Sequence, residues 1–572
     1  MQTETLTVAA GRRNDLFYLG VLLLVYLIVW IPRLTGPINF RWDASTYYML
    51  GTALAEGKGY RLLNEPGEIQ AVQYPPLLPM IVAAHQSIMG TSDYFKVGSV
   101  LRLTYFVISG LFLVMTYVLA RKLLSPVFAL LVGVITALSF SSFLGPSNVL
   151  YADLPFAAAA IGFLLCQQKS NRAIFSIAAG ILAAAAYLLR TAGLALLLAW
   201  IGESLIRGCF RQAGGRAVIA AVVVLFWQGY VWKVTHSYAY RHPIYSYQRA
   251  DYNYPNVTYG QNSRLVDPFR PELGQISLKD VSERLTSNVT AVPVALGESA
   301  VVPTWFGPSL VEQLRRNLHV SFSDDARNLL IGALRFGLFI VGILALIGAG
   351  LVARSRQWVL SLYFGITLLT IVVTPWQNQF WRYLAPVAPL TLIFLFMTFL
   401  ALRAWIRRQN LRWRRPLELL VIAIPAIMIL SLQTAVAGHL FRSRTPISYY
   451  DAAGYERVLK IYDYGSEWHA FDPALEWIRR KAKTATVIAT TVPHLAYLRT
   501  GHQAVLPPFE TSPGTATHLL DEVPVTYLIL DTLGHPGISE RYSAPLVAHR
   551  PEDWRLVFTA PDSMTCVYER AR

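Results

Sequence analysis

Directly after the first hydrophobic span comes the stretch Arg41-Trp42-Asp43-Ala44-Ser45-Thr46-Tyr47-Tyr48. It places Asp43 at the mouth of a membrane helix, where an acidic residue is costly unless it works with a partner. The same loop continues through Gly57-Lys58-Gly59-Tyr60 to Tyr74-Pro75-Pro76-Leu77. We interpret it as an active-site loop that lies on a membrane surface, and the functional hypothesis grows from it.

The composition is that of a membrane protein. Of the 572 residues, 54% are hydrophobic and only 15% are charged, which is unlike a soluble globular protein. Charge-poor runs long enough to cross a bilayer recur along the chain. We therefore predict a polytopic α-helical membrane protein with about eleven spans, at Leu16–Pro32, Leu103–Ala120, Val127–Leu144, Leu150–Cys166, Ala173–Leu189, Thr191–Ile206, Ala217–Trp232, Leu329–Val352, Val359–Pro375, Tyr383–Leu402 and Leu417–Ala437.

The net charge of +16 is explained by membrane topology. Basic residues gather in alternate short loops, most densely between residues 403 and 415, and this is the positive-inside pattern. It predicts a cytoplasmic N-terminus and three long segments outside, at residues 33–100, 233–328 and 438–572. We therefore expect a membrane partner and no nucleic acid. The three cysteines, Cys166, Cys209 and Cys566, offer neither a disulfide framework nor a metal cluster.

The pattern predicts two domains. Residues 1–437 form a transmembrane catalytic domain with outer loops 33–100 and 233–328, and residues 438–572 form an extracytoplasmic α/β domain. In the first loop, Asp43–Ala55 has the spacing of an amphipathic helix. In the C-terminal domain we expect a helix around residues 475–480, a strand at 486–490, a helix at 494–498 that ends at Gly501, and strands at 525–530, 555–559 and 565–568. It carries no Gly-rich phosphate loop, so we expect a structural or substrate-recruiting role.

A tyrosine-dense tract in the second outer loop has two interpretations. Its members are Tyr238, Tyr240, Tyr245, Tyr247, Tyr252 and Tyr254. Stacked aromatic rings with nearby hydroxyls suit the face of a sugar. The alternative is an aromatic belt at the membrane interface.

Two aspartates are the candidate acids. Asp43 is suited to act as general base toward an acceptor hydroxyl or amine, or else it only starts an interfacial helix. Asp153, in Asp153-Leu154-Pro155-Phe156, fits a helix start. Two outer loops that each present an aspartate could also hold an acceptor or a divalent cation between them.

Two arginines flanked by apolar residues are candidates for binding an anion. Arg190 lies in Leu189-Arg190-Thr191-Ala192-Gly193, and Arg382 lies in Trp381-Arg382-Tyr383-Leu384-Ala385-Pro386. A lipid phosphate is the natural ligand of a guanidinium group near the outer leaflet. Snorkelling of the side chain toward the interface is the alternative.

Taken in order, these motifs resemble those of the GT-C superfamily of membrane glycosyltransferases. The likeness is greatest to the protein mannosyltransferase and aminoarabinose transferase branch with its bacterial relatives, and it covers roughly residues 10–400. It is carried by four features: the first loop with Asp43, Tyr47-Tyr48, Gly57-Lys58-Gly59-Tyr60 and Tyr74-Pro75-Pro76-Leu77; Asp153-Leu154-Pro155-Phe156; Leu189-Arg190-Thr191-Ala192-Gly193; and Arg382-Tyr383-Leu384-Ala385-Pro386.

The resemblance implies a hexosyl- or pentosyltransferase of the plasma (bacterial inner) membrane. It would move a sugar from a polyprenyl-phosphate-linked donor to a lipid, glycan or protein acceptor at the outer face, by inverting displacement. Asp43 would be the base, and Asp153 would shape the site. Arg190 and Arg382 would meet the donor phosphate, while the remaining substrate contacts would come from Tyr48, Tyr60, Tyr74 and Tyr383.

The first loop departs from the family pattern, in which some relatives carry paired acids or an acid just before Pro-Pro. Here Ala44 follows Asp43, Gln73-Tyr74 precede Pro75, and Glu65 and Glu68 do not match the motif. The resemblance therefore leaves the second acid and any metal dependence open.

Two other functions remain as alternatives. A transporter or flippase of lipid-linked sugars should show internal repeats and broken spans in matching halves, and the sequence has no clear two-fold pattern. A non-catalytic scaffold should tolerate the loss of Asp43. Asn256-Val257-Thr258 and Asn288-Val289-Thr290 also fit the glycosylation acceptor pattern, which has meaning only in a eukaryotic host.

Overall fold

The structure is a computed structural model that describes residues 2–169, 172–409, 412–443, 445–451, 453–462, 464–483, 485–533, 537–561 and 565–571. The chain divides into two compact units. The helical unit comprises Met1–Leu34, Arg102–Val224 and Arg284–Arg442. The mixed unit comprises Thr35–Leu101, Leu225–Glu283 and Ser443–Arg572. The predicted domain boundary at residues 437 and 438 stays a prediction.

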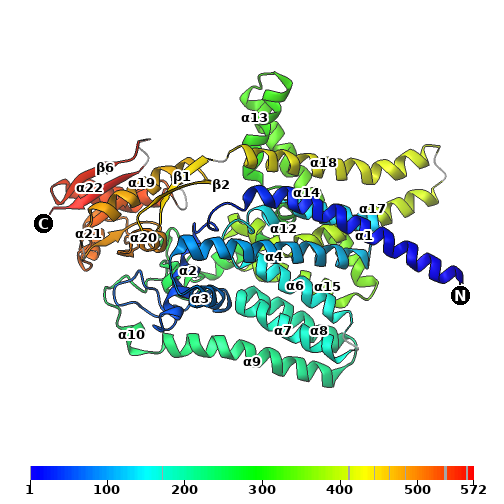
Figure 1. The fold of residues 1–572 in the computed structure, drawn as a ribbon, viewed down its shortest axis with the longest axis horizontal. Coiled ribbons are helices and arrows are strands. Elements are labelled where there is room, and N and C mark those ends of the chain that lie inside the picture. The colour runs from blue at the N-terminus through cyan, green and yellow to red at the C-terminus, as the bar shows by residue number, and fades with distance from the viewer. Residues whose placement is uncertain are drawn as a thin grey trace. The chain divides into compact units, whose positions relative to one another are not determined.

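The helical unit is built from long apolar helices that run alongside one another (Figure 1). In whole or in part it contains α1 (Gln2–Trp30), α4 (Tyr94–Arg121), α5 (Pro126–Leu138), α6 (Asp153–Gln167), α7 (Ala173–Leu189), α8 (Leu194–Ile206), α9 (Phe210–Thr235), α12 (Leu278–Ala300), α13 (Gly307–Leu318), α14 (Asp324–Arg354), α15 (Trp358–Val372), α16 (Phe380–Tyr383), α17 (Ala388–Arg408) and α18 (Arg414–Arg442). The prediction of a helical membrane protein is confirmed.

The number of spans stays a prediction. Among the described residues, six helices are long and apolar enough to cross a membrane, or seven if α12 and α13, which are bent by 64°, form one broken span. Six further apolar helices have 10–17 residues. Several coincide with predicted spans, yet at 1.5 Å per residue a helix of 13–17 residues reaches only about 20–26 Å, short of a hydrocarbon core of about 30 Å.

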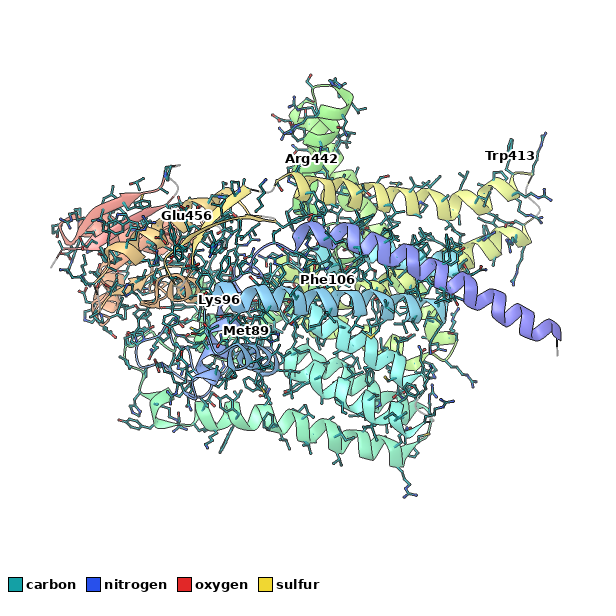
Figure 2. All side chains as sticks on the ribbon, viewed as in Figure 1. Met89, Lys96, Phe106, Trp413, Arg442 and Glu456 are labelled. Carbon is teal, nitrogen blue, oxygen red and sulfur yellow. The ribbon has the colours of Figure 1, made fainter. Side chains whose placement is uncertain are left out.

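Exposed apolar side chains mark the surface of the helical unit. On α18, Ile427 and Met428 are about three-fifths exposed, as expected of side chains that face lipid. Figure 2 shows Trp413 and Arg442 at opposite ends of this helix. Aromatic and basic residues at helix ends favour the membrane–water interface.

Small residues let the long helices of this unit approach closely. A Cβ atom added at Gly342 of α14 would lie 1.9 Å from the carbonyl oxygen of Pro293 in α12. One added at Gly348 would lie 1.9 Å from the carbonyl oxygen of Phe394 in α17. Helix packing within membranes depends on such close backbone contacts, so larger residues at either position would separate the helices.

The mixed unit contains a five-stranded sheet of order β4-β3-β5-β7-β6. Its elements are α2 (Asp43–Ala55), α3 (Leu77–Met89), α10 (Tyr238–Arg241), α11 (Tyr259–Asn262), β1 (Thr445–Tyr450), β2 (Glu456–Ile461), α19 (Ser466–Lys481), β3 (Val487–Ala489), α20 (Pro493–Thr500), β4 (Gln503–Val505), α21 (Pro513–Asp521), β5 (Tyr527–Leu530), α22 (Ala544–His549), β6 (Trp554–Thr559) and β7 (Cys566–Arg570). Strand β3 pairs in parallel with β4 and β5. The predicted C-terminal α/β domain is confirmed as a fold.

Parts of the two predicted outer loops belong to the core of this unit. Tyr245 and Tyr247 are buried in one hydrophobic cluster with Val505 and Leu528 of the sheet. The backbone N–H of Ala504 donates to the carbonyl oxygen of Asn64, at 2.8 Å. The Nδ2 of Asn64 donates to the carbonyl oxygen of Ala504, also at 2.8 Å. Part of the tyrosine tract therefore serves the core, because a buried aromatic ring contributes a large apolar area.

Helix α2 is packed on most sides, although its spacing predicted an interfacial helix with one apolar face. Nine of its residues are buried, including Tyr47, Tyr48 and Leu50. A Cβ atom added at Gly51 would lie 2.6 Å from the side chain of Val82 in α3. The bounds predicted for this helix are confirmed, and the close packing explains why a glycine lies at its centre.

Candidate functional site

The candidate base Asp43 begins α2, where a carboxylate interacts favourably with the helix dipole. The preceding residue, Trp42, has φ +56° and ψ −134°, a backbone conformation that residues with a Cβ rarely adopt. Its ring makes an edge contact with Trp468 of α19, with ring centroids 5.0 Å apart. Local strain of this kind persists where surrounding contacts enforce it, and here it fixes the direction in which α2 starts.

Two of the predicted substrate-binding tyrosines support Asp43, one directly and one through the backbone of the other. The hydroxyl of Tyr74 donates to Oδ1 of Asp43 at 3.1 Å. The hydroxyl of Tyr60 donates to the carbonyl oxygen of Tyr74 at 2.8 Å. Burial raises the pKa of Tyr74 well above its ordinary value, and the Asp43 charge adds to this effect. Tyr74 therefore keeps its proton as a donor to Asp43, while Tyr60 holds the backbone that carries Tyr74.

The third predicted tyrosine of the loop, Tyr48, is fully buried. Its hydroxyl donates to the carbonyl oxygen of Ser92 at 2.8 Å. The ring makes an edge contact with Phe40, with ring centroids 4.9 Å apart. These contacts give Tyr48 a packing role, and a direct contact with substrate stays a prediction.

The two unmatched acids of the loop lie in different environments. Glu65 is buried and accepts hydrogen bonds from the hydroxyl of Tyr245 at 2.6 Å and from Nε2 of Gln248 at 3.1 Å. Burial raises its pKa. Glu68 forms an exposed ion pair with Lys58 at 2.9 Å, and such pairs contribute little to stability. Of the two acids, Glu65 therefore holds the fold of the mixed unit.

A second buried acid of the mixed unit follows β5. Asp531 accepts hydrogen bonds from the hydroxyl of Thr491 at 2.9 and 3.0 Å and from the backbone N–H of Leu533 at 2.9 Å. Burial raises its pKa to about 7. Its carboxyl group ties the end of β5 to the loop after β3.

In the helical unit, three of the predicted residues meet. Asp153 starts α6, and its side chain is only 2% exposed. Its carboxylate pairs with the guanidinium groups of both Arg190, which precedes α8, and Arg382, which lies in α16; the Arg382 pair spans 3.4 Å. Arg190 follows the end of α7 in an extended conformation, which carries its side chain out of the helix. We call these three residues the arginine cluster.

Aromatic rings support both guanidinium groups of the arginine cluster. Arg190 lies over the ring of Tyr383 at 5.7 Å, and Arg382 lies over the ring of Tyr151 at 4.2 Å. One carboxylate balances one of the two positive charges, so the three residues carry a net charge of +1, from +2 and −1. A guanidinium group has five N–H donors in a planar fork that suits phosphate oxygens. The cluster can therefore bind a phosphate monoanion and compensate its charge.

The structure brings the predicted residues Arg190, Arg382 and Tyr383 together, and their anion-binding role stays a prediction. The sequence did not indicate that Asp153 pairs with both arginines. It also missed His494 of α20, which is buried beside α2. A single histidine in a short helix has no local signature that would identify it.

A divalent cation stays a possibility raised by the sequence alone. In the described ranges, no three side chains among His, Cys, Asp and Glu gather closely enough to hold a metal ion.

Both glycosylation-like asparagines are buried. Asn256 is 0% exposed, and Asn288 is 3% exposed. The Nδ2 of Asn288 donates to the carbonyl oxygens of Val372 and Thr374, at 2.7 and 2.9 Å. The folded chain therefore does not present either amide as an acceptor.

The comparisons with known proteins reveal similarity at the level of structure. No family model and no curated protein sequence matches the chain. The oligosaccharyltransferase of Archaeoglobus fulgidus, tethered to an acceptor peptide, matches with a TM-score of 0.52 at 12% identity over 98% of this chain and 74% of that one. The archaeal oligosaccharyltransferase AglB from Archaeoglobus fulgidus, in complex with an inhibitory peptide and a dolichol-phosphate, gives a TM-score of 0.50 at 12% identity over 98% of this chain and 74% of that one. ArnT from Cupriavidus metallidurans, bound to undecaprenyl phosphate, gives a TM-score of 0.49 at 11% identity over 97% of each chain.

Proposed function

We propose that this chain, which has the fold of the GT-C membrane glycosyltransferases, moves a sugar from a polyprenyl-phosphate-linked donor to a lipid, glycan or protein acceptor. The observation that carries the proposal is the arginine cluster, in which Arg190 and Arg382 share the buried carboxylate of Asp153. Two mostly buried cations held by one acid and two aromatic rings form a preorganised site for a phosphate group.

The donor phosphate is assigned to this cluster for reasons of charge and chemistry. Moving a guanidinium group away from water is unfavourable unless an anion compensates it, and the cluster carries one positive charge in excess. A polyprenyl phosphate that leaves from the sugar gains negative charge, so the cluster stabilises the product side of the displacement more than the substrate side. The AglB structure with a dolichol-phosphate supports a lipid-linked phosphate as the ligand class.

The acceptor is assigned to Asp43. In the proposed reaction the acceptor oxygen or nitrogen attacks the anomeric carbon, and the bond between that carbon and the phosphate oxygen breaks. The polyprenyl phosphate departs with the electron pair, and the acceptor proton passes to the Asp43 carboxylate. The hydrogen bond from Tyr74, at 3.1 Å, orients Asp43 for this step. A direct displacement of this kind inverts the anomeric configuration.

The first test is transfer of labelled sugar from a panel of hexosyl and pentosyl polyprenyl-phosphate donors by the purified protein. For a general base we expect Asp43→Asn to lower kcat by about 10²–10⁴-fold. We expect Arg382→Gln to lower kcat/KM for the donor by about 10-fold or more, because a charge-assisted hydrogen bond contributes roughly 1.5–3 kcal/mol. Glu312→Gln, which alters an exposed carboxylate that also pairs with two arginines, is the matched control.

Two outcomes would overturn the proposal. Transfer by Asp43→Asn at the wild-type rate would remove Asp43 as the base. Movement of labelled donor between the leaflets of a vesicle without any transfer would indicate a flippase instead.

The proposed orientation has the N-terminus in the cytoplasm of a bacterial cell and the C-terminal domain outside the inner membrane. Two natural cysteines test it, because Cys209 is exposed between α8 and α9 and Cys566 is partly exposed at the start of β7. In spheroplasts, a membrane-impermeant maleimide should label Cys566 and reach Cys209 only after lysis. The reverse pattern would invert the topology.

A further inference from the structure

Helix α20 of the C-terminal α/β domain carries a histidine whose environment is unusual. His494 is only 6% exposed. Its Nε2 is buried and, within the part of the chain that the structure describes, accepts or donates no hydrogen bond. A buried polar atom left without a partner costs about 1–3 kcal/mol, and an apolar side chain of similar size would avoid that cost. The position therefore favours a role for the imidazole beyond packing.

The neighbour of this histidine is the candidate base. Helix α20 packs against α2, the helix that begins at Asp43. The Asp43 carboxylate interacts electrostatically with His494. Helix α20 also carries Arg499, which forms a buried ion pair with Asp472 of α19 at 3.1 Å. Asp43 is thus the charged group that acts on His494.

The imidazole is neutral under physiological conditions. Burial lowers the pKa of His494 to about 4, although Asp43 acts in the opposite direction. A neutral imidazole has one N–H donor and one acceptor nitrogen. It can therefore donate a hydrogen bond to a carboxylate without becoming an ion pair that would block proton uptake by Asp43.

We propose that His494 is a positioning residue for Asp43, by which the C-terminal domain contributes to the catalytic site. Tyr74 donates to Oδ1 of Asp43. When the acceptor is bound, the Nε2–H of His494, which has no hydrogen-bond partner among the described residues, supplies the second donor and fixes the plane of the carboxylate toward the acceptor. In the reaction the acceptor proton goes to Asp43, and His494 keeps its own proton throughout. The inference rests on the proposed function, and it gives the outer domain a role in the chemistry.

The test compares His494→Ala and His494→Gln in the sugar-transfer assay, in the wild-type background and in Asp43→Glu, which keeps a carboxylate. In the wild-type background we expect His494→Ala to lower kcat about 10-fold, or ~1.4 kcal/mol, with KM for the donor unchanged. His494→Gln, which keeps an N–H donor, should restore kcat to within about 3-fold. In the Asp43→Glu background His494→Ala should cost less than about 2-fold, because coupled residues are not additive.

A structural role would give another result. Equal losses in both backgrounds, or a glutamine variant no better than alanine, would overturn the proposal. His502→Gln, at a half-buried histidine just after α20, is the matched control and should leave kcat unchanged. Melting temperatures of all variants separate a loss of fold from a loss of positioning.

A second readout does not depend on enzyme activity. In protein with isotope-labelled histidine, the imidazole resonance of His494 is assigned by its absence in His494→Gln. It should shift on Asp43→Asn, and the pKa of His494 should fall further, because Asp43 raises it in the wild type. An unchanged resonance would overturn the inference even if no sugar donor is found, whereas a shifted one with no transfer would count against the proposed function alone.

Discussion

Replacing Asp153 with asparagine is expected to destabilise the helical unit strongly. The Asp153 carboxylate is 2% exposed and pairs with Arg190 and Arg382, each 16% exposed. The amide of asparagine keeps the shape but removes the negative charge that both mostly buried guanidinium groups pair with. Breaking a buried ion pair by removing one partner costs about 3–5 kcal/mol. The residual exposure of the arginines places our expectation at the lower end, about 3 kcal/mol.

The assay is thermal unfolding in detergent, followed by tryptophan fluorescence from the 14 tryptophans of the chain. At about 2–4 °C per kcal/mol, a loss of about 3 kcal/mol lowers the melting temperature by roughly 6–12 °C. Adding Arg190→Gln to Asp153→Asn should recover part of the loss, because it removes one of the two uncompensated cations.

Glu312 provides the matched control, because it also pairs with two arginines, Arg315 and Arg316, at 2.7 and 3.1 Å. Unlike Asp153 it is exposed to solvent, where ion pairs contribute little. We expect Glu312→Gln to melt as the wild type does. The reasoning would be refuted if Asp153→Asn also melted as the wild type, or if both variants showed the same decrease.

Three further outcomes are expected. Tyr74→Phe removes the hydroxyl that donates to Asp43 at 3.1 Å. Because a hydrogen bond to a charged group contributes roughly 1.5–3 kcal/mol, we expect kcat to fall by roughly 10-fold or more. An unchanged kcat would show that Tyr74 does not contribute to the reaction. Gly51→Val should destabilise the mixed unit by about 1–3 kcal/mol, measured by limited proteolysis, whereas Gly214→Ala, where no atom lies within 4 Å of an added Cβ, should not. Folded Asp531 keeps its proton up to about pH 7, whereas the unfolded chain loses it near 3.8, so the stability of the wild type falls as pH rises between these values. The melting temperature of Asp531→Asn relative to that of the wild type should therefore increase from pH 5 to pH 8. A difference that stays constant with pH would contradict the burial argument.

Local patterns were sufficient where the structure depends on neighbouring residues. The predicted helix Asp43–Ala55 has the observed bounds. The predicted stop at Gly501 is confirmed by its left-handed conformation, with φ +76°, which glycine adopts without steric cost. The predicted strands at 525–530 and 555–559 overlap β5 and β6, because both carry runs of β-branched and aromatic residues.

Contacts between distant parts of the chain could not be predicted. Asp153 is separated from Arg190 by 37 residues and from Arg382 by 229, and no periodicity links positions so far apart. Strand β4 has three residues, too few to show an alternating pattern. The burial of Tyr245 and Tyr247 depends on a sheet formed more than two hundred residues later, so the tract alone left both interpretations open. The resemblance to a known superfamily indicated the candidate residues, whereas their contacts with one another came from the structure.

The two hydrogen bonds between Asn64 and Ala504 have a consequence for biosynthesis. The two residues are 440 positions apart, and at about 5–20 residues per second the ribosome needs roughly 20–90 s to make the chain between them. During that time the loop with Asp43 has left the ribosome but lacks the strand edge on which it folds. The loop therefore reaches these contacts only after residue 504 has been synthesised. A chain truncated before β4 would lack the backbone partner of Asn64 and would leave the loop without one of its anchoring contacts.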